Sequence, residues 1–244
     1  MPSQPVKSRG TLYGVGVGPG DPELITVKAH RVLQQAPVLC VPKSREEGDS
    51  YVRGFVSHIL DPGRQQLLEL LFPMTKDRSV LELHWNTALE RVLLPLRGGL
   101  DVAFVTEGDP FIYSTFMHLY TVLRERHPEI PVEVIPGVSS VNASAAAAGL
   151  PLVDGAERLA VLPATYEGED LAHLLVQFDT VVLLKVNRVF DRVLEVLERL
   201  GLVDRAVYVR RCGAPDQKIV RDVRSLRGMD LDYLSLLIVK KGRG

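Results

Sequence analysis

The chain has little of what marks several common classes of protein. Its 244 residues include only two cysteines, Cys40 and Cys212, which are too far apart for the spacing of a structural zinc site. Such cysteine usage suggests a reducing compartment, and we expect both thiols to be buried small hydrophobic groups. The six histidines form no pair with a carboxylate at ligand spacing, so we expect no metal site.

The chain also lacks an excess of charge and a long apolar run. Lys and Arg total 29 against 30 for Asp and Glu, and this balance gives no basic field for a nucleic acid partner. No apolar run reaches the ~18 residues of a membrane span, and residues 1–10 show no targeting pattern, so we expect a cytoplasmic protein without a membrane partner. The 46% hydrophobic content is enough for one large core or two modest ones.

Glycine is concentrated in the most informative segment, residues 14–24 (GVGVGPGDPEL). An apolar, partly β-branched run precedes a turn rich in glycine, and Asp21-Pro22 then reads as a helix cap followed by proline at the first helical position. Backbone amides at such a helix start can face a ligand. A turn that serves only the topology of the chain is the alternative.

This segment does not fit a dinucleotide site. A G-x-G-x-x-G frame that starts at Gly14 puts its third glycine on Pro19, and a frame that starts at Gly16 puts it on Asp21. The next predicted strand ends at Lys43, where such a site needs an acidic residue. An NAD-type oxidoreductase is therefore disfavoured.

Two later segments repeat the pattern of an apolar run followed by a glycine turn. Residues 103–116 lead through Gly-Asp-Pro into an apolar helix, and residues 132–140 lead through Pro-Gly into a serine pair. Ligands of open α/β sheets bind at the carboxyl ends of the strands. The three turns therefore predict one crevice at that edge of a sheet.

The rest of the chain predicts an α/β fold of two domains, 1–149 and 150–244, each with a sheet flanked by helices. Residues 44–75 are interpreted as an irregular insertion with a short helix. The last two strands of the second domain are joined too closely for a parallel crossover, so its sheet is expected to be mixed. The predicted strands are 11–17, 37–42, 101–106, 132–135, 158–163, 179–186, 205–210, 217–221 and 233–240; the predicted helices are 22–34, 77–97, 113–126, 138–148, 168–177 and 187–200.

The three motifs resemble those of the tetrapyrrole (corrin and porphyrin) methyltransferases, at residues 11–28, 108–116 and 136–140. Within that family, residues 113–119 are most similar to the branch that methylates precorrin-2 at C(20) in cobalamin synthesis. The resemblance implies a two-domain fold with the active site in a cleft, S-adenosylmethionine as methyl donor, S-adenosylhomocysteine as product, a tetrapyrrole substrate and a homodimer. Another tetrapyrrole or diphthine methylase of this fold is the alternative, and a non-catalytic tetrapyrrole carrier is one from a different class.

The resemblance also implies the site residues. Gly18, Gly20 and Asp21 would form the floor under the substrate. The cofactor contacts would be Pro19, Asp109, Ile112, Ser114, Thr115, Ser139 and Ser140, with Lys185, Cys212, Gly213 and Ser235 from the second domain. From the residues alone, Asp109 could instead hold only a turn, and the two serines could only cap a helix.

Two further groups of residues follow from the chemistry of the reaction. Tyr113 and Glu107 stand beside the second motif and are the candidate catalytic groups, as proton acceptor or substrate contact. A substrate rich in carboxylates calls for cations in its pocket, and for these we select Lys43, Arg53 and Arg188.

Overall fold

The computed structural model describes residues 9–47, 50–75, 77–164 and 168–242. Residues 1–8, part of the segment in which no targeting pattern was found, lie outside these ranges. The chain divides into two compact units, Met1–Ser139 and Ser140–Gly244. The division places helix α5 (Ser140–Ala147) in the second unit, whereas the predicted boundary at residues 149 and 150 placed it in the first.

The first unit is built on a five-stranded parallel sheet in the order β3-β2-β4-β1-β5. The β4 strand is buried along its whole length, as expected for a parallel sheet that is covered on both faces. Since all five strands are parallel, their carboxyl ends lie at one edge. The strands are β1 (Leu12–Gly16), β2 (Val38–Lys43), β3 (Gln66–Leu71), β4 (Val102–Thr106) and β5 (Val132–Ile135).

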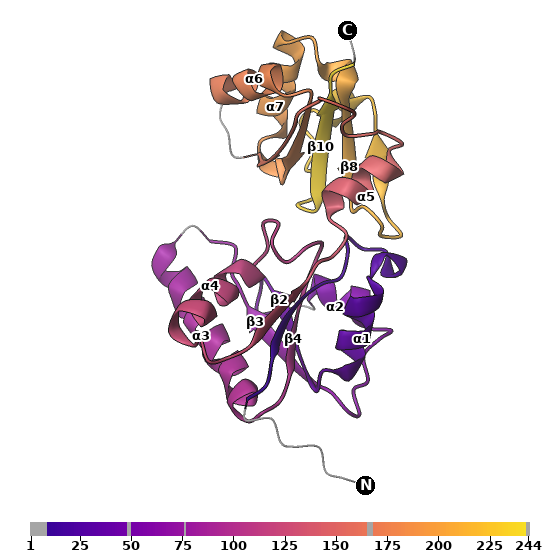
Figure 1. Cartoon of the computed structure of the whole chain (residues 1–244). Coiled ribbons are helices and arrows are strands. Elements are labelled where there is room, and N and C mark those ends of the chain that lie inside the picture. Colours follow the sequence, from indigo (N-terminus) through magenta and orange to yellow (C-terminus); the bar gives the residue numbers. More distant parts are fainter. Residues whose placement is uncertain (1–8, 48–49, 76, 165–167, 243–244) are drawn as a thin grey trace. The chain divides into compact units, whose positions relative to one another are not determined.

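Helices cover both faces of this sheet (Figure 1). Successive side chains of a strand point to opposite faces. Val38 and Cys40 therefore join the hydrophobic cluster with α3 and α4, while Leu39 and Val41 join the cluster with α1 and α2. The helices are α1 (Val27–Gln35), α2 (Tyr51–Val56), α3 (Arg78–Arg97) and α4 (Phe116–Arg126).

The interpretation of residues 44–75 as an irregular insertion is wrong, although the short helix expected in the segment is present. The segment contains α2 and a strand of the sheet, β3, which pairs with β2 from Val38↔Gln66 to Lys43↔Leu71. The sequence of β3, QLLELL, has no β-branched residue and no clean alternation, so it carries few of the signals that predict a strand.

The helix predicted at 22–34 begins later than expected. Residues Pro22–Leu24 form a short 3₁₀ helix, Ile25 is extended, and α1 starts at Val27. The predicted cap is confirmed, because the Asp21 carboxylate accepts a hydrogen bond from the Glu23 amide at 2.9 Å. A second cap at Thr26, whose hydroxyl accepts from the Ala29 amide at 3.2 Å, starts α1 itself.

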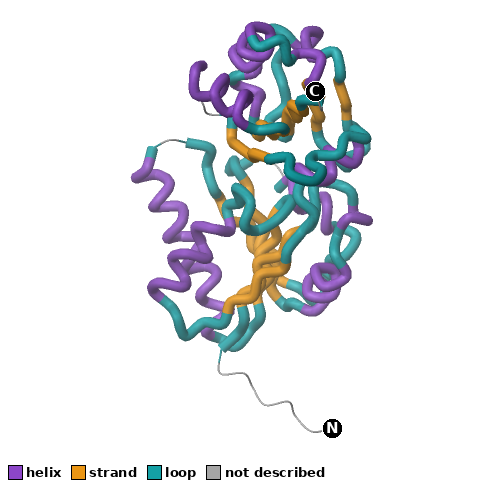
Figure 2. The backbone as a smooth tube through the Cα atoms, turned by 45° about the horizontal axis from the view of Figure 1, so that its top comes forward, coloured by secondary structure: helices purple, strands orange, loops and turns teal. Residues whose placement is uncertain are grey.

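The second unit contains the mixed sheet that was predicted, in the order β6-β7-β10-β8-β9. Figure 2 distinguishes the strands and helices of each unit by colour. β6 and β7 are parallel, while β10 runs antiparallel to β7 and β8, and β9 antiparallel to β8. The reason given for the mixed sheet is wrong: the last two strands, β9 and β10, are not neighbours, and because each is antiparallel to β8 between them, they run parallel to each other. The elements are β6 (Leu159–Pro163), β7 (Thr180–Leu184), β8 (Ala206–Arg210), β9 (Lys218–Val220), β10 (Ser235–Lys240), α6 (Gly168–Gln177) and α7 (Phe190–Arg199).

Among the helices of the described ranges, none combines the length and the apolar character that a membrane-spanning helix needs.

Candidate functional site

Three loops meet at the carboxyl edge of the first sheet. They follow β4, β1 and β5, which are neighbours in the sheet. The ladder of hydrogen bonds between β1 and β4 continues beyond the strands, since the Val17 amide donates to the Thr106 carbonyl at 3.0 Å and the Gly108 amide donates to the Gly18 carbonyl at 2.8 Å. The first two predicted motifs are therefore one continuous surface.

Glycine lets the third loop join the other two. A Cβ on Gly137 would lie 2.1 Å from the Gly108 carbonyl oxygen, and a Cβ on Gly16 would lie 2.5 Å from the same atom. Such distances are shorter than real Cβ contacts, so the three backbones touch only because these positions have no side chain. Gly18 and Gly108 also have positive φ angles, of 77° and 65°, which favour glycine. The result is a cradle formed by backbone.

Asp109 holds this cradle together. One carboxylate oxygen accepts a hydrogen bond from the Phe111 amide at 2.9 Å, and the other accepts from the Gly137 amide at 3.1 Å. The first bond forms the turn of the Gly-Asp-Pro motif, and the second joins that motif to the Pro-Gly loop. The predicted alternative, a turn-forming aspartate, is thus present in the structure, and the carboxylate also links two loops.

Ser114 lies just before α4, the helix that follows the second motif. Its hydroxyl accepts from the Phe116 amide at 3.0 Å and lies 2.9 Å from the Thr106 hydroxyl. Thr106 is buried at the end of β4 and was not predicted as a site residue. The signal that could have identified it is a polar residue at the end of an otherwise apolar strand.

Tyr113 is not helical, although the helix was predicted to start there. Its φ angle is +51°, a left-handed conformation that is costly for a bulky residue, and α4 begins only at Phe116. Ile112 and Tyr113, which follow the Gly-Asp-Pro motif in the sequence, are both nearly half exposed. Glu107, which directly precedes the motif, is half-buried. Strained residues of this kind cluster at functional sites.

The remaining predicted residues of the first and third motifs differ in exposure. Gly18, Pro19 and Gly20 are buried, and Asp21 is half-buried where it caps the short 3₁₀ helix. Ser139 is buried, and Ser140 and Thr115 are half-buried at the starts of α5 and α4.

His118 lies one turn into α4 and stacks on the indole of Trp85, with ring centroids 4.0 Å apart and planes at 18°. Partial burial lowers the pKa of His118, so its imidazole is neutral at neutral pH. The stacking fixes the orientation of a neutral imidazole close to the second motif.

The four residues predicted in the second unit share one edge of its sheet. Lys185 and Cys212-Gly213 follow the parallel strands β7 and β8, and Ser235 begins the antiparallel β10. The Lys185 amide donates to the Ser235 carbonyl at 3.1 Å, and the Lys185 ammonium lies 5.6 Å from the ring centroid of Tyr233. The structure therefore brings these residues together, and their role stays a prediction.

Of the predicted substrate cations, Lys43 and Arg53 converge on Glu69. The Lys43 ammonium lies 3.3 Å from one carboxylate oxygen, and the Arg53 guanidinium lies 3.7 Å from the other. Glu69 is on β3, so it was missed together with that strand. Arg188 is exposed and lies in a 3₁₀ helix of the second unit, whereas Lys43, Arg53 and Glu69 belong to the first unit.

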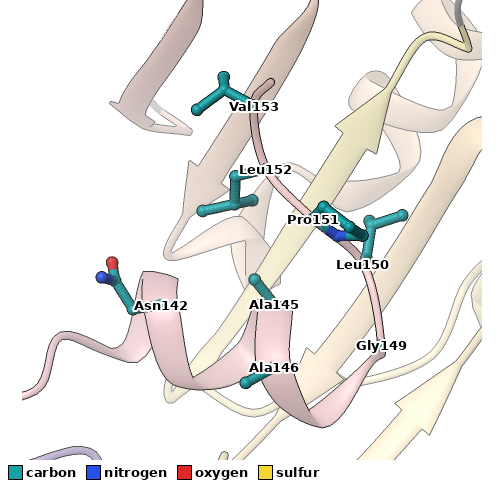
Figure 3. Close-up of a pocket in the computed structure, with 8 residues that line it drawn as sticks. All are labelled: Asn142, Ala145, Ala146, Gly149, Leu150, Pro151, Leu152 and Val153. Carbon is teal, nitrogen blue, oxygen red and sulfur yellow. The ribbon is translucent and has the colours of Figure 1, made fainter. Parts of the chain in front are cut away.

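The second unit also carries a hollow of about 500 Å³ between α5 and the segment that follows it (Figure 3). The wall is mostly apolar, and Asn142 contributes its amide. A glycine with φ of +61° ends α5, and the segment then turns back beside the helix. The lining residues are Asn142, Ala145, Ala146, Gly149, Leu150, Pro151, Leu152 and Val153.

These features can be compared with known proteins. The model of one family, the tetrapyrrole (corrin/porphyrin) methylases, matches residues 11–226. The chain belongs to this family. The match includes the three loops of the cradle and most of the second unit, so the predicted family is confirmed.

Two relatives show how far the similarity of this methylase extends. It is 38% identical over 236 residues to the probable cobalt-precorrin-2 C(20)-methyltransferase of Methanocaldococcus jannaschii, a match that covers 94% of this chain and 96% of the relative. It is also 38% identical to the cobalamin biosynthesis protein CobIJ of Mycobacterium tuberculosis (strain ATCC 25618 / H37Rv). That match covers 98% of this chain and 47% of the relative, so the chain spans about half the length of CobIJ.

A solved structure confirms the fold. Uroporphyrin-III C-methyltransferase from Thermus thermophilus, complexed with S-adenosylhomocysteine, superimposes with a TM-score of 0.68 at 26% identity. The match covers 95% of this methylase and 98% of that chain. The predicted α/β fold with two helix-flanked sheets is therefore that of the family.

Proposed function

We propose that this methylase transfers a methyl group from S-adenosylmethionine to C(20) of precorrin-2 or cobalt-precorrin-2 in cobalamin biosynthesis. The observation that carries the proposal is the match to the Methanocaldococcus jannaschii relative, which extends over nearly the whole of both chains. The bound S-adenosylhomocysteine of the Thermus thermophilus enzyme supports the choice of cofactor. The name of the mycobacterial relative supports the pathway.

The cradle of the first unit suits such a cofactor. A Cβ on Gly16 or Gly137 would clash with the Gly108 carbonyl, so glycine at these positions lets the three loops that carry the proposed cofactor contacts come together. When bound, S-adenosylmethionine supplies an electrophilic methyl group on a sulfonium. The residues that would hold it are Pro19, Asp109, Ile112, Ser114, Thr115, Ser139 and Ser140, with Lys185, Cys212, Gly213 and Ser235 from the second unit.

The work of the protein in this reaction is mainly positioning. Orientation of two bound reactants can supply roughly 7 to 11 kcal/mol of a barrier, so a site without a nucleophilic triad is sufficient. The chain must hold the nucleophilic carbon in line with the sulfur–methyl bond, exclude water, and accept the proton that the methylated carbon loses. Tyr113 and Glu107 are the proposed proton acceptors, and Gly18, Gly20 and Asp21 the floor under the macrocycle.

We propose further that the methylase is a cytoplasmic homodimer. Neither Cys40 nor Cys212 is in a disulfide, which agrees with a reducing compartment. Sedimentation equilibrium of the purified protein tests the dimer, and a single species with the mass of one chain contradicts it.

Anaerobic incubation with precorrin-2 and, separately, cobalt-precorrin-2 tests the reaction. With a methyl-labelled donor, mass spectrometry is expected to show a product that has gained one methyl group, at C(20) by NMR. Transfer to a different carbon, or only to a different tetrapyrrole or to diphthine, would support another methylase of the same fold. Calorimetric titration with S-adenosylhomocysteine and with NAD distinguishes the other classes, because a carrier binds neither and an oxidoreductase binds NAD.

A further inference from the structure

Two cationic side chains from different elements face one carboxylate of the first unit, and a third binds the backbone of the same residue. Lys43 at the end of β2 and Arg53 of α2 each face one oxygen of Glu69, at 3.3 and 3.7 Å. Arg91 of α3 donates to the backbone carbonyl of Glu69 at 2.6 Å. We call Lys43, Arg53, Arg91 and Glu69 the edge cluster.

The edge cluster lies at the same edge of the sheet as the glycine cradle. β2 and β4 are adjacent and parallel, with Val38 opposite Val102 and Cys40 opposite Phe104. When this register is continued, Lys43 is level with Glu107, the residue that precedes the Gly-Asp-Pro turn. Neighbouring strands are ~4.8 Å apart, so a large ligand that contacts the cradle also extends over the edge cluster.

Lys43 is largely enclosed by its contacts, whereas the Arg53 side chain is partly exposed. The Lys43 side chain is only 18% exposed, and it is satisfied by Glu69 and by the Glu46 carbonyl, to which its ammonium donates at 2.7 Å. The Arg53 side chain is 45% exposed, and its distance from Glu69 is longer than a hydrogen bond. A guanidinium carries five N–H donors in a planar fork, so a contact to Glu69 and a second anion can coexist on it.

We propose that the edge cluster is a subsite for a carboxylate side chain of the substrate. Arg53 is the group that binds the incoming carboxylate, Lys43 adds a second charge beside it, and Glu69 is the positioning residue that fixes both cations. This inference rests on the proposed function, because it gives the acidic rim of the macrocycle a place at the sheet edge. It would make the edge cluster a determinant of substrate affinity and leave the methyl donor unaffected.

Steady-state methyl transfer by the full chain tests the subsite with the variants Arg53→Met and Lys43→Met. Arg64→Met is the matched control, since Arg64 is also an exposed arginine paired with a carboxylate, that of Asp61, but precedes β3, at the opposite edge of the sheet. Loss of one charge-assisted hydrogen bond corresponds to a factor of about 10 to 100. We therefore expect KM for the tetrapyrrole to rise at least tenfold in the first two variants and not in the control, with kcat and KM for the methyl donor within twofold of wild type.

A binding experiment makes the test independent of catalysis. Uroporphyrin, whose side chains all end in carboxylates, is titrated against each variant by quenching of the Trp85 fluorescence, beside the methyl ester of the same porphyrin. Arg53→Met is expected to weaken binding of the acid tenfold and binding of the ester not at all, and Arg53→Lys is expected to lie between Arg53→Met and wild type. Glu69→Gln is expected to weaken binding of the porphyrin acid at least threefold and to leave the unfolding midpoint unchanged, because Lys43 and Arg53 are then no longer fixed.

The outcomes separate the two proposals. If Arg53→Met binds the acid and methylates the substrate as the Arg64→Met control does, the subsite is refuted although the methyltransferase remains. If wild type transfers no methyl group but Arg53→Met still loses the acid selectively, the subsite stands and the proposed function fails. Equal losses of acid and ester binding would also overturn the subsite, because they indicate a general change of the surface.

Discussion

Asp109 and Gly137 are joined across two loops by a hydrogen bond of 3.1 Å, from the Gly137 amide to a carboxylate oxygen. The other oxygen of Asp109 accepts from the Phe111 amide. Replacement by alanine leaves two backbone donors without this acceptor. We expect Asp109→Ala to lower the free energy of unfolding of the first unit by about 1 to 3 kcal/mol, measured by urea denaturation with Trp85 fluorescence, and to weaken S-adenosylhomocysteine binding in calorimetry.

Asp61→Ala is the control for this prediction. Asp61 also forms a turn, by accepting from the Gly63 amide at 3.1 Å, but it lies before β3 and joins no second loop. Equal effects of the two substitutions on S-adenosylhomocysteine affinity would mean that the link between loops is unimportant for binding.

Gly137→Ala tests the contact of the three backbones. The added Cβ would meet the Gly108 carbonyl at 2.1 Å, and rigid backbone cannot move away cheaply. We expect a loss of about 3 kcal/mol of stability and of most methyl transfer. Gly54→Ala in α2 is the control, since nothing lies within 4 Å of its added Cβ, and alanine in a helix is expected to stabilise by about 0.5 to 1 kcal/mol.

Tyr113 allows stability and activity to be separated. Asparagine tolerates a φ of +51° better than tyrosine, so Tyr113→Asn is expected to raise the unfolding free energy by about 1 kcal/mol. If the phenol accepts the proton, kcat falls in Tyr113→Asn and in Tyr113→Phe, although only the former changes the strain. If the kcat of Tyr113→Phe equals that of wild type, Tyr113 is not the proton acceptor and Glu107 remains as the proposed one.

Cys40 predicts a dependence of stability on pH. Burial raises the pKa of its thiol from 9.0 to about 12, so the folded state keeps the neutral form that the unfolded chain loses. This contribution is complete below pH 9 and is lost as pH rises toward 12, at about 1.4 kcal/mol per pH unit. The difference in unfolding free energy between wild type and Cys40→Ala is expected to be constant from pH 6 to 8 and to shrink above pH 9. A constant difference up to pH 11 would contradict the raised pKa.

The loops of the cradle were predicted correctly because glycine and aspartate carry backbone information in the sequence. A glycine such as Gly137 shows that a side chain is excluded, and Asp21 before a proline identifies a cap. β3 gave no such signal, because its run of leucines around Glu69 is stabilised by pairing with β2, a contact between distant parts of the chain. The left-handed backbone conformation of Tyr113 could not be predicted from the sequence either, since it depends on how the contact between Ser114 and Thr106 fixes the following turn.

The assignment of the cations needed the structure for a different reason. Lys43 and Arg53 were selected from their places in the sequence, but only the strand that carries Glu69 shows that they act on one carboxylate. Sequence alone could not distinguish such a pair from two solvated surface charges.

The contact between Gly16, Gly108 and Gly137 consists of backbone atoms alone, and this has a consequence for how the protein can change. The close approach of these glycines does not depend on the exposed side chains nearby, although the Asp109 carboxylate joins two of the loops. Phe111, Ile112 and Tyr113, which stand exposed on the cradle, can therefore be exchanged without rebuilding it, so new specificities are accessible to laboratory evolution through a few surface positions.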